Sequence, residues 1–149
     1  MKLWHYTTAF RIPEIIESGE IRTSNANATG NREVPTLWLS SNPIWENTAT
    51  KYFNDGFNRY PLTKEQQHER FGLGRIEVNT QTISYFTWHT FVKNIAAKRH
   101  IARGMEESGR KSGGNPKQWF GSTKPIGTEH FLSAEIWDGN EWKVVKTEF

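Results

Sequence analysis

The sequence predicts an α+β fold, with strands at both ends of the chain and helices between them. Two short segments rich in aromatic and aliphatic residues, 2–7 and 36–40, have the composition of strands. The segment 130–146 alternates on both sides of Asp138-Gly139, a dipeptide typical of a hairpin turn. Between these ends, apolar residues recur at helical spacing. The mixture of the two periodicities indicates the α+β class.

The composition favours one globular domain over residues 1–149. Hydrophobic residues make up 35% of the chain and aromatic residues 13%, with seven Trp, so large rings must supply much of a core. No apolar run approaches the roughly 20 residues that cross a bilayer, and the N-terminus lacks the apolar segment of a signal peptide. We therefore expect a cytoplasmic protein.

The absence of cysteine narrows the possible chemistry. It excludes disulfides, a thiolate nucleophile and Cys-ligated zinc. The histidines after the first strand are not spaced with carboxylates in a metal-binding motif, so no metal is expected. The chain also lacks a Gly-x-Ser-x-Gly elbow, which argues against a serine hydrolase.

The first strand is followed by a short predicted helix over residues 12–18. Pro13 suits the first helical turn, Glu14 suits the positive end of the helix, and Gly19 provides a stop. The chain is expected to become extended again at Ile21.

The next part of the chain begins with a polar loop over residues 24–35, which leads into the second strand. Apolar spacing then predicts a helix over residues 45–53. A loop is expected over residues 54–61.

The middle of the chain has the clearest helix signals. Thr63 with Gln66 three residues later forms a capping-box pattern for a helix over residues 63–70. A third strand is expected over 74–78 and extended chain over 83–88. The longest predicted helix covers residues 89–108. Its buried residues are expected to be Phe91, Ile95, Ala102 and Met105.

The last part of the chain is a glycine-rich loop over residues 109–116 and the C-terminal hairpin, with strands at 130–137 and 141–146. Alternation divides the first hairpin strand into two faces. One face is expected to carry Leu132, Ala134 and Ile136, and the other Glu129, Phe131, Ser133, Glu135 and Trp137.

The charge is mildly positive, with a formal net value of +3. Basic residues gather between Lys93 and Lys117. This cluster is either the solvated face of a helix and loop or a patch that attracts a polyanion.

Several short motifs together resemble one enzyme family. Leu-Trp-His at residues 3–5, followed by Ile-Ile-Glu-Ser-Gly-Glu-Ile-Arg at 15–22, resembles the first strand and helix of the poly(ADP-ribose) polymerase-like transferases. Leu-Trp-Leu-Ser-Ser at 37–41, followed by residues 47–52, is similar to that family's second strand and helix. The C-terminal hairpin resembles the strand pair that carries the family's glutamate. Where the family has glycine after the histidine, this chain has Tyr6.

The resemblance implies a fold and an activity. The fold would be an ADP-ribosyltransferase-like split central β-sheet with flanking helices, and NAD would lie in a cleft between the halves. The activity would be transfer of ADP-ribose from NAD to a macromolecular acceptor, protein or nucleic acid, with release of nicotinamide and without a metal. A role as a toxin or in phage defence follows by analogy alone.

The resemblance also implies roles for individual residues. His5 would donate a hydrogen bond to a ribose hydroxyl, and Tyr52 would stack on nicotinamide. The remaining predicted nucleotide contacts are Tyr6, Thr7, Ser40, Ser41 and Arg110.

Two glutamates compete for the catalytic position beside the developing oxocarbenium ion. Glu129 matches the family position if the hairpin is aligned from its far end. Glu135 lies in the most strand-like part and is flanked by apolar residues, so its charge should face a cleft or a partner. We favour Glu135 slightly over Glu129.

Three alternatives remain open at this stage. The chain could be an NAD glycohydrolase that passes the sugar to water. It could be an enzyme similar to the tRNA 2′-phosphotransferases, which share the fold class. It could also be a non-catalytic binding or inhibitor module that docks through exposed aromatic residues.

Overall fold

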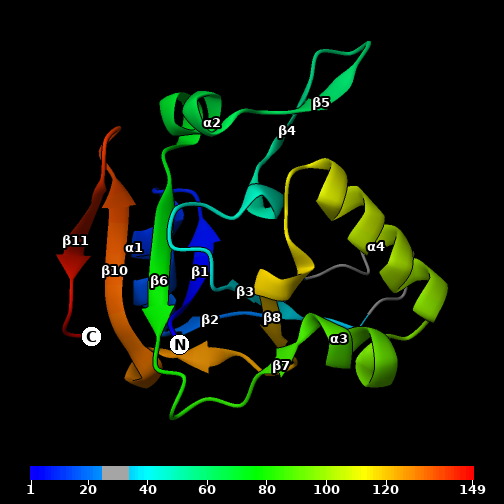
Figure 1. The fold of residues 1–149 in the computed structure, drawn as a ribbon. Coiled ribbons are helices and arrows are strands. Elements are labelled where there is room, and N and C mark those ends of the chain that lie inside the picture. Colours follow the sequence, from blue (N-terminus) through cyan, green and yellow to red (C-terminus); the bar gives the residue numbers. More distant parts are fainter. Residues whose placement is uncertain (25–33) are drawn as a thin grey trace.

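A computed structural model describes residues 1–24 and 34–149 of the chain. It shows a mixed α+β fold built on a seven-stranded antiparallel sheet in the order β11-β10-β6-β1-β3-β8-β7 (Figure 1). The strands of this sheet are β1 (Leu3–Thr7), β3 (Leu37–Ser40), β6 (Gly74–Val78), β7 (Phe86–Thr87), β8 (Trp119–Ser122), β10 (Phe131–Trp137) and β11 (Trp142–Lys146). The α+β class predicted from the sequence is thus confirmed.

Two short strand pairs accompany the large sheet. They are β2 (Glu20–Ile21) with β9 (Ile126–Gly127), and β4 (Tyr52–Asn54) with β5 (Arg59–Pro61). The second pair forms a hairpin that includes the region 54–61, for which the sequence predicted a loop. Gly56 turns this hairpin with φ of 90°, which a side chain would disfavour.

The helices lie around the sheet and at one end of it. They are α1 (Arg11–Ser18), α2 (Lys64–Phe71), α3 (Trp88–Thr90), the π-helical turn η3 (Phe91–Ile95) and α4 (Arg99–Lys111), with 3-10 turns η2 (Asn47–Ala49), η4 (Pro116–Gln118) and η5 (Thr128–His130). Within the described ranges, no helix combines the length and apolar character needed to cross a bilayer.

Two predicted helices agree closely with the structure. Helix α1 ends at Gly19, whose φ of 86° is the left-handed conformation expected of a glycine stop. Helix α2 begins with the predicted capping box, in which the Thr63 side chain accepts from Gln66 N and the Gln66 side chain accepts from Thr63 N.

The predicted helix over residues 45–53 is wrong. The structure has only the 3-10 turn η2, after which Thr50 is extended and β4 begins. The Glu46 carboxylate accepts from Thr48 N, and the Gln67 side chain accepts from Lys51 N. These two contacts fix the backbone at both ends of the turn, so tertiary hydrogen bonds override the helical spacing.

The predicted helix over residues 89–108 is divided into three parts. Ala96 is extended, with ψ of 137°, and separates η3 from α4. The expected buried residues nevertheless meet in one cluster with Trp88 and Trp119. Beyond the break, Ala102 and Met105 of α4 pack against the aromatic rings of this cluster.

The C-terminal hairpin is confirmed, but the predicted faces of its first strand are partly wrong. The pairing with β6 shifts between Phe131 and Ser133, so Leu132 is an extra residue and 44% exposed. This bulge turns Phe131 to the same side as Ala134, because one inserted residue inverts the alternation.

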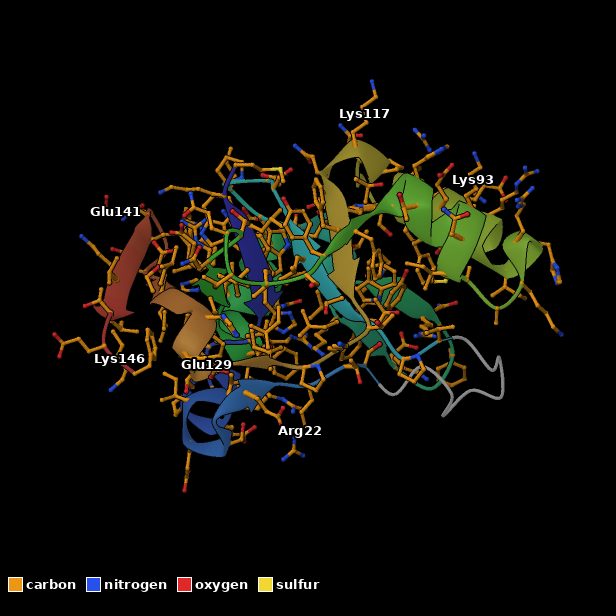
Figure 2. All side chains as sticks on the ribbon, turned by 90° about the horizontal axis from the view of Figure 1, so that it is seen from below. Arg22, Lys93, Lys117, Glu129, Glu141 and Lys146 are labelled. Atoms are coloured by element: carbon orange, nitrogen blue, oxygen red, sulfur yellow. The ribbon has the colours of Figure 1, made fainter. Side chains whose placement is uncertain are left out.

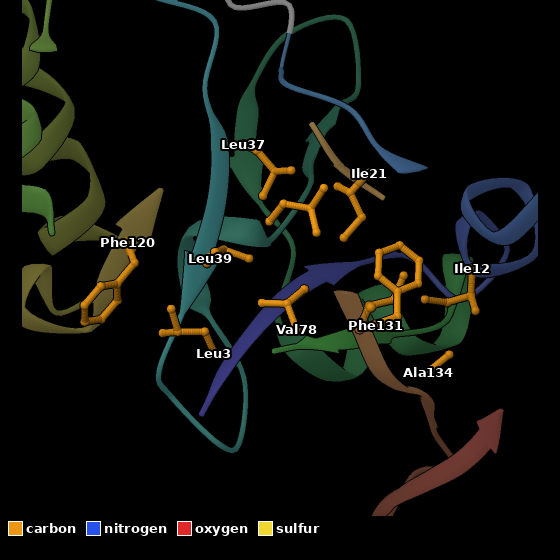
Figure 3. Close-up of a cluster of buried hydrophobic side chains, with 11 residues drawn as sticks. Leu3, Ile12, Ile21, Leu37, Leu39, Val78, Phe120, Phe131 and Ala134 are labelled. Atoms are coloured by element: carbon orange, nitrogen blue, oxygen red, sulfur yellow. The ribbon is translucent and has the colours of Figure 1, made fainter. Parts of the chain in front are cut away.

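The sheet separates two hydrophobic regions. On the α1 side, Leu3, Ile76 and Ala134 pack with Ile12 in a mainly aliphatic core (Figure 3). The opposite side is mainly aromatic and contains two clusters, one around Trp4, Tyr6 and Trp45 and one around Trp88 and Trp119. Alternating residues of β1 therefore enter two different environments.

Candidate ligand-binding cavity

A large hollow lies between β1, α1, β3 and the segment around η2. Its volume is about 810 Å³, which is within the range of roughly 300–1,000 Å³ typical of small-molecule sites. Both polar and aromatic side chains line it. The lining includes Trp4, His5, Tyr6, Thr7, Ser40, Glu46, Trp88 and Trp119, with the cations Arg11, Arg22 and Lys51.

The cavity opens because β1 and β3 pair only briefly. Their register contains a single pair, Trp4 with Ser40, whereas β1 pairs with β6 along all five of its residues. Beyond that pair the His5 side chain crosses between the strands, with Nδ1 3.0 Å from the Trp38 carbonyl oxygen. Residues from both faces of β1, such as His5 and Tyr6, line this hollow.

His5 is positioned for use as a neutral group. A carbonyl oxygen can only accept, so Nδ1 carries the proton and Nε2 of the neutral ring is an acceptor. Burial lowers the pKa of His5 below its usual 6.5, and the Trp38 hydrogen bond offsets part of this effect. This geometry reverses the donor role that the sequence argument gave to His5.

Glu46 is the buried one of three glutamates that line the cavity, the others being Glu14 and Glu20, and it was not among the residues predicted from the sequence. It is 6% exposed, and Oε1 accepts from Ser40 Oγ at 2.7 Å. Oε2 accepts from three donors: Thr48 N at 3.1 Å, Thr48 Oγ1 at 2.6 Å and Trp119 Nε1 at 3.2 Å. All four donors are neutral. Within the described residues no Lys, Arg or His lies at ion-pair distance from Glu46.

This arrangement leaves a buried negative charge beside the cavity. A carboxylate offers about four acceptor positions, and Oε1 uses only one of its own. Hydrogen bonds from neutral groups make the buried charge tolerable without cancelling it. The signal in the sequence was weak, because Glu46 follows Trp45 in a segment whose spacing suggested an ordinary helix.

The aromatic strand residues complete the wall. Burial raises the pKa of Tyr6 to about 12, although the neighbouring Arg75 acts in the opposite direction. The Tyr6 hydroxyl donates to the Asn42 carbonyl oxygen and accepts from Arg75. The Trp4 indole N–H is buried and has no hydrogen-bond partner in the described part of the chain.

Glu135 lies outside this cavity wall, in an ion pair with Arg75. Arg75 Nε is 2.7 Å from one Glu135 oxygen and Nη2 is 3.3 Å from the other. The guanidinium also lies over the rings of Trp4 and Trp142, at 4.6 Å and 4.4 Å from their centroids. Both charges of the pair are therefore satisfied within the protein.

His5 and Glu135 face opposite sides of the sheet. His5 is paired with Ile76 and Ile76 with Ala134, whereas Tyr6 is paired with Arg75 and Arg75 with Glu135. Paired residues of neighbouring strands share a face, and successive residues alternate. The structure therefore does not bring His5 and Glu135 together.

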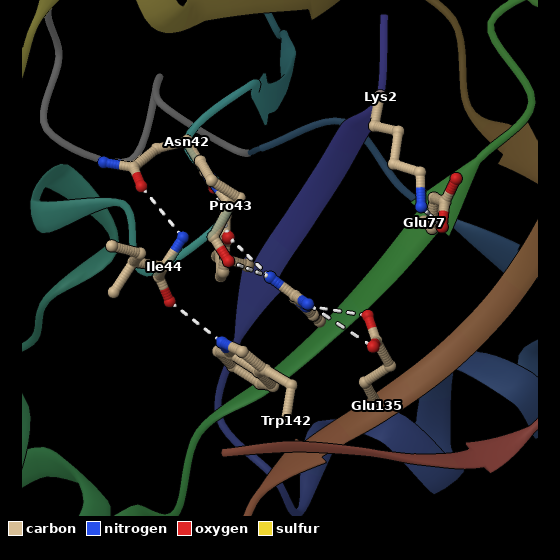
Figure 4. A network of polar contacts seen from close by, with 9 residues as sticks. Lys2, Asn42, Pro43, Ile44, Glu77, Glu135 and Trp142 are labelled. Atoms are coloured by element: carbon tan, nitrogen blue, oxygen red, sulfur yellow. Dashed lines mark hydrogen bonds and ion pairs between the residues drawn. The ribbon is translucent and has the colours of Figure 1, made fainter. Parts of the chain in front are cut away.

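The Arg75 pair instead supports the loop that presents Glu46. Arg75 Nη1 donates to the Pro43 carbonyl oxygen at 2.6 Å, and Trp142 Nε1 donates to the Ile44 carbonyl oxygen at 2.9 Å (Figure 4). With the Tyr6 contact to Asn42, three consecutive carbonyl groups are held by side chains from β1, β6 and β11. The C-terminal hairpin thus helps to fix the position of a residue about 90 positions earlier.

The other predicted site residues are dispersed. Glu129 lies in η5, is exposed and approaches His130. Tyr52 is 46% exposed on β4, beneath the Arg59 guanidinium. Arg110 is exposed on α4 and pairs with Glu106. These residues and Ser41 are absent from the described cavity wall, whereas His5, Tyr6, Thr7 and Ser40 belong to it.

Two further results concern ligands and relatives. In the described ranges, no group of three or more His, Cys, Asp or Glu side chains is arranged to hold a metal ion. No family model, curated protein or solved structure matches the chain.

Proposed function

We propose that this protein is an NAD-dependent ADP-ribosyltransferase that binds NAD in the cavity between β1 and β3. The observation that carries the proposal is the presence, in one cavity, of a neutral His5 and a buried Glu46 whose charge no cation neutralises. The resemblance of the N-terminal motifs to the poly(ADP-ribose) polymerase-like transferases supports the same activity.

The chemistry requires a negative charge near the anomeric carbon of the nicotinamide ribose. When the bond to nicotinamide breaks, positive charge develops on the sugar, as in glycoside hydrolysis. A fixed carboxylate in a site of low dielectric stabilises that charge without reorganising. Glu46 meets this requirement, whereas the charge of Glu135 is already balanced by Arg75. We therefore assign the catalytic position to Glu46 in place of Glu135 or Glu129.

The remaining wall suits the other parts of the dinucleotide. His5 Nε2 accepts a hydrogen bond from a ribose hydroxyl, because Nδ1 is committed to Trp38. Arg22 and Lys51 supply positive charge for the pyrophosphate. No metal takes part in this scheme.

The test measures nicotinamide release from NAD by the whole protein, together with transfer of label from NAD to macromolecules of a cell extract. Removing a charge-stabilising group typically lowers kcat about 10²–10³-fold, so Glu46→Gln should lose activity on that scale. Glu129→Gln is the matched control, because it removes a carboxylate outside the cavity wall.

Three results would change the proposal. Equal loss in Glu46→Gln and Glu129→Gln would refute the assignment of Glu46. Accumulation of free ADP-ribose without labelled macromolecules would mean that water is the acceptor, and the proposed reaction would then be hydrolysis and not transfer. Failure of the wild-type protein to bind NAD in calorimetry would refute the use of NAD itself.

A further inference from the structure

The positive charge of the protein is concentrated in one lobe, which we define as residues 88–117 and which contains α3, η3, α4 and η4. This lobe has seven Lys and Arg residues against two Glu, a formal charge of +5. The rest of the chain has twelve Lys and Arg against fourteen Asp and Glu, a formal charge of −2. A mildly basic chain thus consists of a strongly basic lobe and a slightly acidic remainder.

These cations are available to a partner. Among the described residues, Arg110 is the only one of the seven with a carboxylate at ion-pair distance. Lys93 and Lys117 extend from the side of the molecule that carries α4, whereas Lys146 lies at the opposite end (Figure 2). Clustered unpaired cations create a positive potential that attracts anionic polymers.

The lobe contains a groove of about 790 Å³ between α3, α4 and η4. Its lining includes His89 and His100 and the cations Arg103 and Lys117. Two carboxylates line it as well. Glu106 is engaged by Trp88 Nε1 at 2.7 Å and by Arg110, whereas Glu107 is exposed.

Gly104, which lines this groove, is an unusual residue for its position in the fold. It lies in the interior of α4, where glycine costs about 1 kcal/mol relative to alanine. A Cβ at this position would meet nothing within 4 Å, so packing does not require glycine here. A helix without a side chain at this point does allow a ligand backbone to approach closely.

The chemistry of the lobe selects the class of partner. The large hydrophobic residues that are exposed elsewhere in the described chain include none from residues 88–117. A membrane-binding helix or an apolar protein interface would present such residues. A groove of this size within a basic lobe, lined in part by Trp88 and Trp119, suits a single strand.

We propose that the basic lobe binds single-stranded nucleic acid along the groove that passes Gly104. Trp88 and Trp119 line both this groove and the NAD cavity, so a bound strand lies beside the proposed reaction site. It follows, if the proposed function is right, that the strand is the acceptor of ADP-ribose. The binding itself requires no NAD.

The test is fluorescence anisotropy with labelled oligothymidylate and oligouridylate of about 20 nucleotides, in the absence of NAD. Binding should weaken with salt by about 0.7 logarithmic units per logarithmic unit of salt for each phosphate contact. Arg103→Glu with Lys117→Glu should lower affinity at least about tenfold and reduce the salt slope by about 1.4. Lys143→Glu with Lys146→Glu, on β11, is the control with the same change in net charge and should change affinity less than about twofold.

Two single variants sharpen the location. Gly104→Leu should preserve or raise the melting temperature, because leucine is the better helix former, yet lower the affinity at least about threefold. Glu107→Gln should raise the affinity, because it removes an exposed negative charge from the groove.

Equal effects of the two charge reversals would overturn the proposal, as would unchanged affinity in Gly104→Leu. Tighter binding of a duplex than of the single strand would also overturn it. So would displacement of the labelled strand by polyglutamate as effectively as by unlabelled single strand. A negative result in the binding assay does not affect the proposed role of Glu46 in nicotinamide release. Either proposal can therefore fail without the other.

Discussion

Two buried glutamates, Glu46 and Glu135, differ in what surrounds them. Both are less than one-tenth exposed. Glu135 has a bidentate Arg75 partner, so the pair is neutral as a unit. Glu46 has four neutral donors and borders a cavity. Burial by itself therefore does not show whether a cation balances the charge of a carboxylate.

The two glutamates are also connected. The Arg75 that neutralises Glu135 holds the Pro43 carbonyl, and the loop that begins there presents Glu46. One carboxylate thus anchors the framework while the other lines the cavity. The following predictions separate these roles, beginning with the largest expected effect.

Removing the cation of the neutral pair should have the largest effect on stability. Arg75→Met leaves Glu135 buried without its partner, and breaking a buried ion pair in this way costs about 3–5 kcal/mol. The measurement is the free energy of unfolding in urea. Combining it with Glu135→Leu should recover part of the loss, since no charge then remains buried. A double variant less stable than Arg75→Met would contradict the pairing.

Replacing each glutamate by glutamine should lower the stability of the protein by different amounts. Glu135→Gln weakens charge-assisted hydrogen bonds and should cost about 1.5–3 kcal/mol of stability. Glu46→Gln keeps an oxygen for three of its donors, and Ser40 Oγ can accept from the new amide, so the cost should stay below about 1 kcal/mol.

The same two variants should rank in reverse for nicotinamide release, with Glu46→Gln the more damaged enzyme. Parallel denaturation and kinetic measurements on both proteins check the reversal. If one variant proves worse in both assays, the division of roles is wrong.

Trp142→Phe should have a smaller effect, because it removes a hydrogen bond and keeps an aromatic ring over Arg75. Loss of the Nε1 contact to the Ile44 carbonyl should cost about 1 kcal/mol, as is typical of a single hydrogen bond. Since Ile44 precedes Glu46 by two residues, kcat should fall while the KM for NAD stays nearly constant. A change confined to KM would place the influence of Trp142 elsewhere.

The smallest expected effect is a pH dependence caused by His5. Its pKa is lowered in the folded protein, so between that value and 6.5 the unfolded chain binds more protons. Stability contributed by neutral His5 is complete above pH 6.5 and declines as the pH falls below it, by at most about 1.36 kcal/mol per pH unit.

His5→Asn provides the comparison, because the amide can still donate to the Trp38 carbonyl and does not titrate. Subtracting its unfolding free energies from those of the wild type between pH 5 and 8, about the range in which histidine titrates, isolates the contribution of His5. A difference that grows as the pH rises above 7, beyond about the ordinary histidine pKa, would contradict this assignment.

Much of the fold was determined by local signals in the sequence. The glycine stop of α1, the capping box of α2 and the Asp-Gly turn of the hairpin each rest on residues within a few positions of one another. Such features depend on backbone conformations and hydrogen bonds that neighbouring residues supply, so the sequence alone specifies them.

The wall of the cavity depended on contacts between residues that are distant in the sequence. His5 was recognisable because a strand and a helix frame it. Glu46 was not, because its importance comes from Ser40, Thr48 and Trp119, the last of which is 73 residues away. The bulge at Leu132 and the brief pairing of β1 with β3 likewise arise from register between distant strands. Local propensity fixed the elements, whereas tertiary packing decided which faces meet and which carboxylate retains an unbalanced charge, because those outcomes depend on contacts between residues far apart in the chain.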